Sequence, residues 1–509
     1  MSSSSSTTRT RGRAAVAVMP PNTGRSPEYL YDRRVQVRSA LALIALSLAA
    51  GGCGAGGAAD SPGSLRTLPG AVEPHVTVVE PAYRTAPGYL FVAEKAGGGS
   101  PGGPLILDDR GRAVWYHQLP LGLEATDFRT QTYHGKPVLT WWQGVIATAG
   151  YGTGVGEVYD ASYHRIAEVH TANGFDADLH ELQLTPRGTA LITAYHEVPA
   201  DLSAVGGPAK GYALDCIVQE IDVATGRLVF EWHSIGHVPL TDSRDAHQEP
   251  ARDATKKRPF DYFHVNSVAD GPNGTLLVSA RNTSTIYLIA RDGHIVWRIG
   301  TARSDFGPPA AVKMRYQHDA RLSGDLLSFF DNGGVPREEP YSRPTVLALD
   351  FATRTARVVQ TFVTPERIAS PFEGSIQPLP TGGALVGWGG VRKVTEFGRH
   401  GEVRLELELP AGDTYRAFRL PWHGDPGGRP AVALRGSTVY ASWNGKLGIA
   451  AWRALAGPDA GQLAPAARKA RSGLETAIPL PERPRAVAVE ALDAAGDVLG
   501  TSPAIVLPG

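Results

Sequence analysis

The feature that most constrains the fold is a short motif that recurs through the middle of the chain. Each copy has a turn glycine, a short apolar run and then a polar or aromatic residue. The copies are Gly135–Trp142, Gly188–Tyr195, Gly274–Arg281 and Gly324–Asp331, with a close variant at Gly382–Trp388. The repeating units begin near residues 76, 124, 178, 262, 316 and 372. Six turn-rich, all-strand units of roughly fifty residues predict a six-bladed β-propeller, whereas a β-helix would have shorter rungs and a stricter period.

The segments around the repeats differ from them in pattern. Residues 1–53 are predicted to be an N-terminal extension with a signal peptide, 54–75 a linker, and 76–425 the propeller. In residues 426–509, alternating strands at 438–443, 447–454 and 486–491 favour a small β-sandwich of the immunoglobulin or fibronectin type. A further blade is the alternative, because Gly436 and Trp443 repeat the motif's spacing. The predicted fold class is therefore all-β, a propeller followed by a sandwich.

Composition excludes some classes of function. Charged residues make up 20% and hydrophobic residues 42% of the chain, which is typical of a soluble globular protein. The formal net charge is zero, so the sequence does not indicate a nucleic-acid-binding protein.

The N-terminal region resembles an export signal. Arginines 33, 34 and 38 precede an apolar run over residues 40–50, which is too short to span a membrane but suits a signal peptide. Two glycines and Cys53 follow, as in a lipoprotein signal whose cysteine is lipidated. We therefore expect an exported protein that is either anchored by lipid to the outer face of the membrane or secreted. The alternative is a cytosolic protein with a disordered tail. If Cys53 is lipidated, Cys216 has no disulfide partner.

Propeller geometry predicts which side chains meet. The starts of the first strands and the ends of the second strands of the blades converge around one mouth of the central channel. Three histidines stand at first-strand starts, namely His180, His264 and His318. The residues at second-strand ends are Trp142, Tyr195, Arg281, Asp331 and Trp388. A lone histidine on a strand is usually structural, but three in corresponding places favour a site.

The chemistry of this set points to an anionic substrate. His180, His264, Arg281 and Asn266 offer N–H donors that suit a tetrahedral oxyanion. Asn266 lies two residues after His264 and shares its face of the strand, and Asp178 is the one acid that shares a face with His180. A divalent cation suits the site less well, because Arg281 would repel it.

Several phrases in the sequence resemble the arylsulfotransferase (aryl-sulfate sulfotransferase) family in its actinobacterial branch. They are DLHELQLTPRGTALITAY, DYFHVNSV, SARNTS, SDF and QHDAR, and the resemblance covers about residues 75 to 425. It implies a six-bladed propeller and a sulfuryl transfer from an aryl sulfate to a phenol, without a nucleotide sulfate donor or other cofactor. The family's sulfated histidine falls on His318. Its remaining sulfuryl-binding residues fall on His180, His264, Asn266 and Arg281.

The resemblance implies a ping-pong mechanism with a role for each residue. His318 attacks the sulfur, while Arg281, His180 and Asn266 hold the charge on the sulfuryl oxygens. His264 moves the proton between the phenol oxygens of donor and acceptor. Trp142, Trp388, Tyr195 and Tyr316 are candidates for an aromatic slot, with packing between blades as the alternative role.

Two other functions remain open from the residues alone. Three neutral histidines around one open position are a catalytic zinc pattern, so His180, His264 and His318 also fit a metal-dependent hydrolase or lyase. The second alternative is a non-catalytic surface propeller that binds a ligand at the channel mouth.

Overall fold

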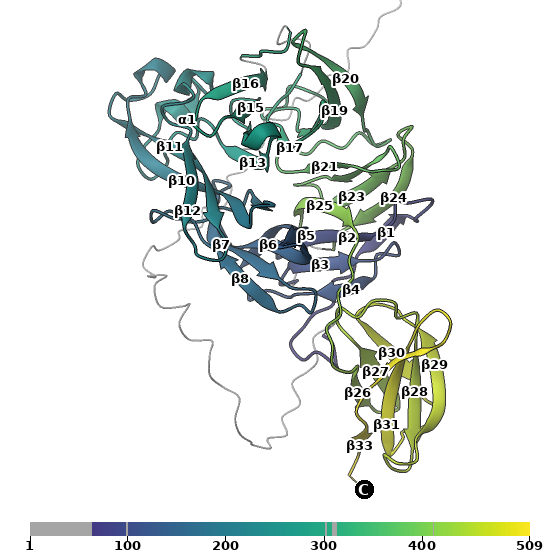
Figure 1. Cartoon of the computed structure of the whole chain (residues 1–509). Coiled ribbons are helices and arrows are strands. Elements are labelled where there is room, and N and C mark those ends of the chain that lie inside the picture. The colour runs from purple at the N-terminus through teal and green to yellow at the C-terminus, as the bar shows by residue number, and fades with distance from the viewer. Residues whose placement is uncertain (1–63, 98–99, 301–302, 308–312, 411, 509) are drawn as a thin grey trace, which may run out of the picture. The chain divides into compact units, whose positions relative to one another are not determined.

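The computed structural model describes residues 64–97, 100–300, 303–307, 313–410 and 412–508, and these residues are almost entirely β-strands and turns (Figure 1). Its helical segments are one turn each, α1 (Glu249–Arg252) and the 3-10 turns Ser203–Val205, Leu240–Asp242 and Pro272–Gly274. No described helix is long and apolar enough to cross a membrane. The predicted signal segment and Cys53 lie outside the described residues.

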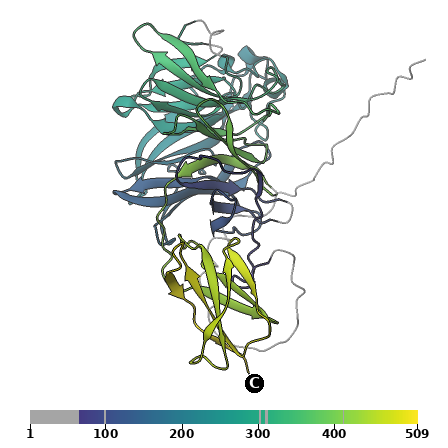
Figure 2. The ribbon, with the colours of Figure 1, turned by 90° about the vertical axis from the view of Figure 1, so that its right-hand side faces the viewer.

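Strands β1 to β25 form six antiparallel sheets of four or five strands (Figures 1 and 2). Four sheets are built from consecutive strands. The first contains β5 (Glu124–Tyr133), β6 (Lys136–Ile146), β7 (Gly152–Tyr159) and β8 (Arg165–Val169). The second contains β9 (Leu182–Leu184), β10 (Thr189–Ala200), β11 (Gly211–Asp222) and β12 (Leu228–His233). The third contains β13 (Val265–Asp270), β14 (Leu276–Ala280), β15 (Thr285–Ile289) and β16 (Ile295–Gly300). The fourth contains β17 (His318–Ser323), β18 (Leu326–Asp331), β19 (Arg343–Asp350) and β20 (Thr355–Thr361).

The other two sheets combine both ends of the repeat region. The fifth contains β21 (Ser375–Pro378), β22 (Ala384–Gly387), β23 (Lys393–Phe397) and β24 (Val403–Glu408), with β1 (Thr77–Glu80) paired to β24. The sixth has the order β25 (Thr414–Leu420), β2 (Tyr89–Glu94), β3 (Gly103–Leu107) and β4 (Ala113–Tyr116). Strand β25, from the end of the repeat region, therefore completes the sheet that contains β2, β3 and β4 from its start. The repeat count did not predict this exchange of strands.

The sheets close into a ring. Contacts link β5 to β9, β10 to β13, β13 to β17, β17 to β21, β21 to β25 and β25 back to β5. This closed, propeller-like all-β arrangement leaves only short inner sheet edges, which are protected within the ring. The five glycines of the repeated motif sit in the hairpins between the first and second strands, and their φ values of 61° to 83° lie in the left-handed region that glycine adopts without strain.

A buried ion cluster fills the centre of the ring. The side chain of Arg416, on β25, is 0% exposed, and its Nη1 lies 2.7 Å from Oδ1 of Asp127. Its Nη2 lies 3.1 Å from Oε2 of Glu181, and its Nε lies 3.3 Å from Oδ1 of Asp319. Asp127 lies on β5, Asp319 lies on β17 and Glu181 directly precedes β9, so the three carboxylates are held by three different sheets. Arg129 and Arg321 also contact Glu181, so three arginines face three acids.

Glu181 and Asp319 adjoin His180 and His318 in the sequence but point the other way, as strand alternation predicts. The backbone reinforces this at the start of β17, where Asp319 has a φ of 53° beside a β-bulge between His318 and Arg321. Arg416 Nη2 also donates to the backbone oxygens of His180 (3.0 Å) and Asn266 (2.9 Å). The ion cluster therefore holds the backbone that carries the candidate site.

The residues after 430 form two further antiparallel sheets. One has the order β26 (Ala431–Arg435), β27 (Thr438–Ser442), β30 (Glu475–Pro479). The other has the order β29 (Ala464–Ala470), β28 (Ala451–Gly457), β31 (Ala486–Leu492), β32 (Val498–Thr501), and β33 (Ile505–Val506) pairs with β31. Buried residues of both sheets, among them Val439, Trp452 and Val489, form one hydrophobic cluster.

The ion cluster predicts an unequal response to two substitutions of the same kind. Arg416→Met leaves Asp127, Glu181 and Asp319 without their shared cation, and we expect a loss of about 3–5 kcal/mol in the free energy of unfolding. Arg227→Met removes an exposed arginine and should change that free energy by about 0.5 kcal/mol or less. Urea unfolding followed by circular dichroism measures both. Equal stability of the two variants would contradict a structural role for the cluster.

Candidate functional site

A cavity of ≈ 340 Å³ lies at the starts of the inner strands. It brings together His180, His264, Arg281 and His318, which the sequence analysis placed at one channel mouth. The other lining residues are Ile146, Thr148, Ala149, Gly150, Leu179, Asp261, Phe372 and Glu373. The cavity therefore combines an imidazole and guanidinium cluster with an apolar wall.

Two of the histidines are held by carboxylates. Nδ1 of His180 lies 2.5 Å from Oδ2 of Asp178, the acid that was expected to share its face. Nδ1 of His264 lies 2.5 Å from Oδ2 of Asp261. The two rings are nearly perpendicular, with centroids 5.1 Å apart. With Nδ1 engaged, Nε2 is the nitrogen that each ring has available for a ligand.

His318 is held differently. Its Nδ1 lies 2.7 Å from Oδ1 of Asn332 and 3.0 Å from the backbone oxygen of Tyr316. Burial lowers the pKa of His318 well below its usual range, and the charge of Arg281 adds to the effect. Burial also lowers the pKa of His264, although Asp261 opposes the shift. Both rings are therefore predominantly neutral at pH 7.

Arg281 is a cation without a carboxylate within ion-pair distance among the described residues. Its Nη1 donates to Oδ1 of Asn282 at 2.6 Å, and its guanidinium carbon lies 4.4 Å from the centroid of the Tyr316 ring. The backbone N–H of Arg281 donates to the oxygen of His264 at 2.9 Å, which fixes the segment after β14 beside that histidine. The arginine is therefore available to bind an anion in the cavity.

Tyr195 and Asn266 lie behind the histidines and outside the cavity lining. The Tyr195 ring packs 5.6 Å from the rings of both His180 and His264, and its hydroxyl donates to the oxygen of Val265 at 2.6 Å. Asn266 is 0% exposed and its Nδ2 donates to the oxygen of Gln317 at 2.7 Å. In this geometry both residues brace the strand starts.

The two tryptophans of the predicted aromatic slot lie in the packed interior. The indole N–H of Trp142 donates to the oxygen of Ala177 at 3.0 Å, and that of Trp388 donates to Oγ1 of Thr395 at 2.9 Å. Both side chains are 0% exposed, so the structure corresponds to the packing role that was the alternative. Trp142 lies within β6, because that strand runs on to Ile146 and is longer than the motif suggested. Tyr316 stacks on Arg281, and its hydroxyl donates to Asp245 at 2.9 Å.

Sequence reasoning missed several residues of the site. Asp261 lies in the phrase DYFHVNSV, three residues before His264, and that spacing was the signal that could have found it. Asn332 follows the predicted strand end Asp331 by one position, whereas Asp331 itself pairs with Arg343 at 2.8 Å. Phe372 and Glu373 lie on the connection between β20 and β21, where no repeat pattern indicates a site.

The three histidines do not form a metal site in this arrangement. Among the described residues, no group of three His, Cys, Asp or Glu side chains is placed to hold a metal ion. Cys216 is buried and is not in a disulfide.

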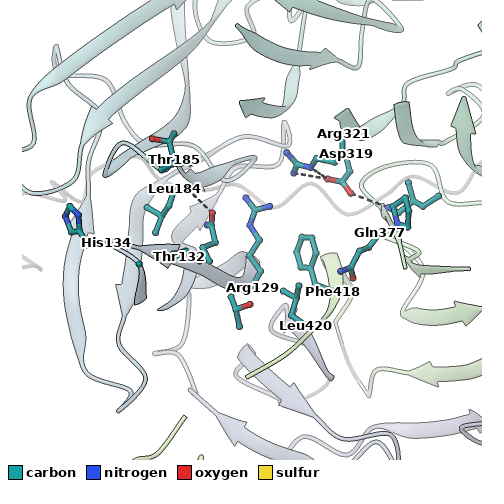
Figure 3. A pocket seen from close by; sticks show the side chains of 16 residues that line it. Arg129, Thr132, His134, Leu184, Thr185, Asp319, Arg321, Gln377, Phe418 and Leu420 are labelled. Atoms are coloured by element: carbon teal, nitrogen blue, oxygen red, sulfur yellow. Dashed lines mark hydrogen bonds and ion pairs between the residues drawn. The ribbon is translucent and has the colours of Figure 1, made fainter. Parts of the chain in front are cut away.

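A second cavity, of ≈ 690 Å³, lies toward the other end of the inner strands (Figure 3). Arg129, Asp319 and Arg321 line it together with Phe418 and Leu420. Because Asp319 belongs to the buried ion cluster, that cluster separates this cavity from the one that His318 lines.

A family model described as arylsulfotransferase (ASST) matches residues 129–409, which is more than half of the chain. The chain belongs to this family. The matched region contains the three histidines and Arg281, and family membership supports an aryl sulfotransferase activity. No curated protein matches the chain significantly.

The solved structures that match this member of the arylsulfotransferase family are distant from it. A protein of unknown function from Bacteroides caccae is 13% identical, with a TM-score of 0.39, over 65% of this chain and 98% of that one. A Lactobacillus plantarum protein is 12% identical, with a TM-score of 0.36, over 83% and 97% of the two chains. Virginiamycin B lyase from Staphylococcus aureus is 12% identical, with a TM-score of 0.29, over 76% and 99%. These likenesses are too weak to indicate a function.

The unpaired guanidinium predicts a strict requirement for arginine at position 281. Arg281→Lys keeps the charge but loses the planar fork that binds two oxygens of one group. We expect turnover of an aryl sulfate to fall at least about tenfold, which corresponds to about 1.4 kcal/mol. Steady-state kinetics with a chromogenic aryl sulfate and a phenol acceptor measure the effect. A lysine variant as active as the parent would mean that Arg281 does not grip the sulfuryl group.

Proposed function

We propose that the protein transfers a sulfuryl group from an aryl sulfate to a phenolic acceptor by a ping-pong mechanism through a sulfohistidine on His318. The observation that carries the proposal is the shared cavity of His318 and Arg281. A buried neutral imidazole with a free Nε2 is a nucleophile, and an unpaired guanidinium beside it binds a sulfate ester. No nucleotide donor and no cofactor enter the proposal.

In the first half-reaction, the Nε2 lone pair of His318 forms a bond to sulfur while the bond between sulfur and the aryl oxygen breaks. The phenol oxygen leaves with the electron pair. Arg281 and His180 hold the equatorial sulfuryl oxygens, as cationic and N–H donors do in phosphoryl transfer. The apolar wall formed by Ile146, Leu179 and Phe372 supports an aromatic substrate.

In the second half-reaction, an acceptor phenol attacks the sulfur and His318 is the leaving group. His264 takes the proton from the acceptor oxygen, and its neutral resting state suits it to act as a base. Asp261, which accepts from Nδ1 of His264, then stabilises the imidazolium that forms. The imidazolium of His264 then gives this proton to the next departing phenol oxygen or to solvent, which restores the neutral ring.

We also propose the finer architecture that the sequence predicts. The closed ring of contacts among the inner strands supports counting the six sheets as six blades. The shared cluster of the last two sheets supports a separate sandwich of the immunoglobulin or fibronectin type over 426–509. The quoted phrases support membership of the actinobacterial branch.

The proposal predicts a stoichiometric intermediate. Aryl sulfate without an acceptor should release about one equivalent of phenol per enzyme and then stall, and intact-mass analysis should show one sulfuryl adduct. His318→Ala should lose both the burst and the adduct. His264→Ala is the matched control, because it should slow both half-reactions by about 10²–10⁴-fold and still form the adduct.

A different kinetic pattern would reject this mechanism. Double displacement gives parallel lines in reciprocal plots of rate against donor at several acceptor concentrations. Intersecting lines with no adduct on His318 would mean direct transfer between two bound substrates. Phenol release that continues without an acceptor would indicate a hydrolase.

For location, we propose export and lipid anchoring at Cys53 on the outer face of the membrane. The apolar run over 40–50 and the small residues before the cysteine support this. Cys53→Ser should release the protein to the medium or leave an unprocessed precursor, because stable anchoring needs the acyl chains. Fractionation of cells that express both forms checks it. An equal cytosolic distribution of both forms would contradict export.

A further inference from the structure

The three histidines of the cavity differ in the group that each meets at Nδ1. His180 and His264 each face a carboxylate, from Asp178 and Asp261, at 2.5 Å. His318 instead faces two uncharged oxygens, Oδ1 of Asn332 at 2.7 Å and the backbone oxygen of Tyr316 at 3.0 Å. The difference is in the charge of the partner, since all four of these oxygens accept a hydrogen bond.

The orientation of the Asn332 amide is fixed by its surroundings. Its Nδ2 donates to the backbone oxygens of Ser370 at 3.2 Å and Glu373 at 2.9 Å. Because backbone oxygens only accept, the amide nitrogen must face them and Oδ1 must face His318. Asn332 is 0% exposed, so water does not compete for these bonds.

This orientation decides the tautomer of His318. Nδ1 lies between two acceptors, so it must carry the proton. The lone pair of the neutral ring is then on Nε2, the nitrogen with no partner among the described residues. The partner of Nδ1 thus determines which nitrogen is nucleophilic.

The uncharged partner also determines the charge of the ring. A carboxylate at Nδ1 stabilises an imidazolium, whereas an amide oxygen stabilises it much less. Arg281, His264 and His180 face His318 from neighbouring strand ends, and the positive charge of Arg281 opposes protonation of His318. Asp261 and Glu373 line the same cavity, and Glu373 is ion-paired with Lys95. The lowered pKa of His318 agrees with this balance.

We propose that Asn332 is a positioning residue that makes His318 the nucleophile, by holding it as the neutral Nδ1–H tautomer with the Nε2 lone pair toward the cavity. This inference rests on the proposed function. During transfer, a bond forms between Nε2 and sulfur, and the bond between sulfur and the aryl oxygen breaks. The ring keeps its Nδ1 proton and takes the positive charge, while the electron pair leaves on the phenol oxygen. Oδ1 of Asn332 continues to accept from Nδ1 throughout.

The test replaces the uncharged partner by a charged one and follows adduct formation against pH. In the wild-type protein, the rate of the phenol burst should stay high as the pH falls through about 6.5, the usual pKa of histidine, because the pKa of His318 is lowered. Asn332→Asp gives His318 the kind of partner that His180 and His264 have. We expect its acid limb to move up by at least one pH unit, with a tenfold slower burst on that limb and recovery at higher pH.

Two further variants separate this role from a structural one. Asn332→Leu removes the acceptor without adding charge, and should slow the burst at every pH while the acid limb stays in place. Ser342→Ala is the matched control. Its Oγ lies 2.9 Å from the Asn332 backbone oxygen and 3.0 Å from that of Ser370, so it perturbs the same contacts without touching His318. It should leave the profile of the burst unmoved.

A direct measurement on the wild-type protein covers the case in which a variant does not fold. Nitrogen-15 spectra of histidine-labelled protein report which ring nitrogen carries the proton, with His318→Ala used to identify the signal. We expect a proton on Nδ1 only. A proton on Nε2, or a profile of Asn332→Asp that superimposes on the wild-type one, would overturn the inference. If the wild-type protein forms no adduct at all, the proposed function fails instead.

Discussion

The buried guanidinium of Arg416 is the interaction on which the rest of the structure depends. It joins carboxylates from three sheets at distances of 2.7 to 3.3 Å, in a place that water does not reach. Such a group is stable only with its partners complete, so the sheets must meet in one arrangement. The same side chain holds the backbone of His180 and Asn266. Two kinds of contact therefore fix the geometry of the cavity: the hydrogen bonds of Arg416 to the backbone that carries the site, and the strand pairing within each sheet.

Much of the fold could be predicted from the sequence, because each turn glycine marks a hairpin, and a hairpin is formed by residues that are close together in the sequence. Each one begins the second strand of a sheet, and its left-handed backbone is a property of a few residues. Closure of the ring could not be predicted in the same way. It pairs Leu420 with Tyr89, and nothing in either segment alone indicates its partner. The lengths of β6 and β10 were also hidden, because both strands continue past the motif, which moved Trp142 from a strand end into the interior.

The site was predictable where a residue type recurs at the same point of the repeat. His180, His264 and His318 recur at first-strand starts and Arg281 stands at a second-strand end, so the repeat predicts that all four meet in one cavity. The groups that orient them were less visible, since Asp261 and Asn332 each occur once and act through a single oxygen. Asn332 illustrates the limit, because the motif indicates Asp331 and the side chain that reaches His318 is the next one. An asparagine next to an aspartate has no pattern that tells which of the two turns inward.

The exchange of strands between the two ends of the repeat region has a consequence for the order of folding. Strand β25 is synthesised more than three hundred residues after β2, with which it pairs, so the ring stays open until nearly the whole repeat region exists. Arg416 lies on that late strand. Until it arrives, the three acids Asp127, Glu181 and Asp319 have only two arginines beside them, Arg129 and Arg321, and one negative charge is left without a partner. The segment that seals the ring therefore also brings the positive charge that allows the centre to become dry. An intermediate that lacks this strand would have an open, hydrated and acidic channel, so final assembly joins strand pairing and charge neutralisation in one step.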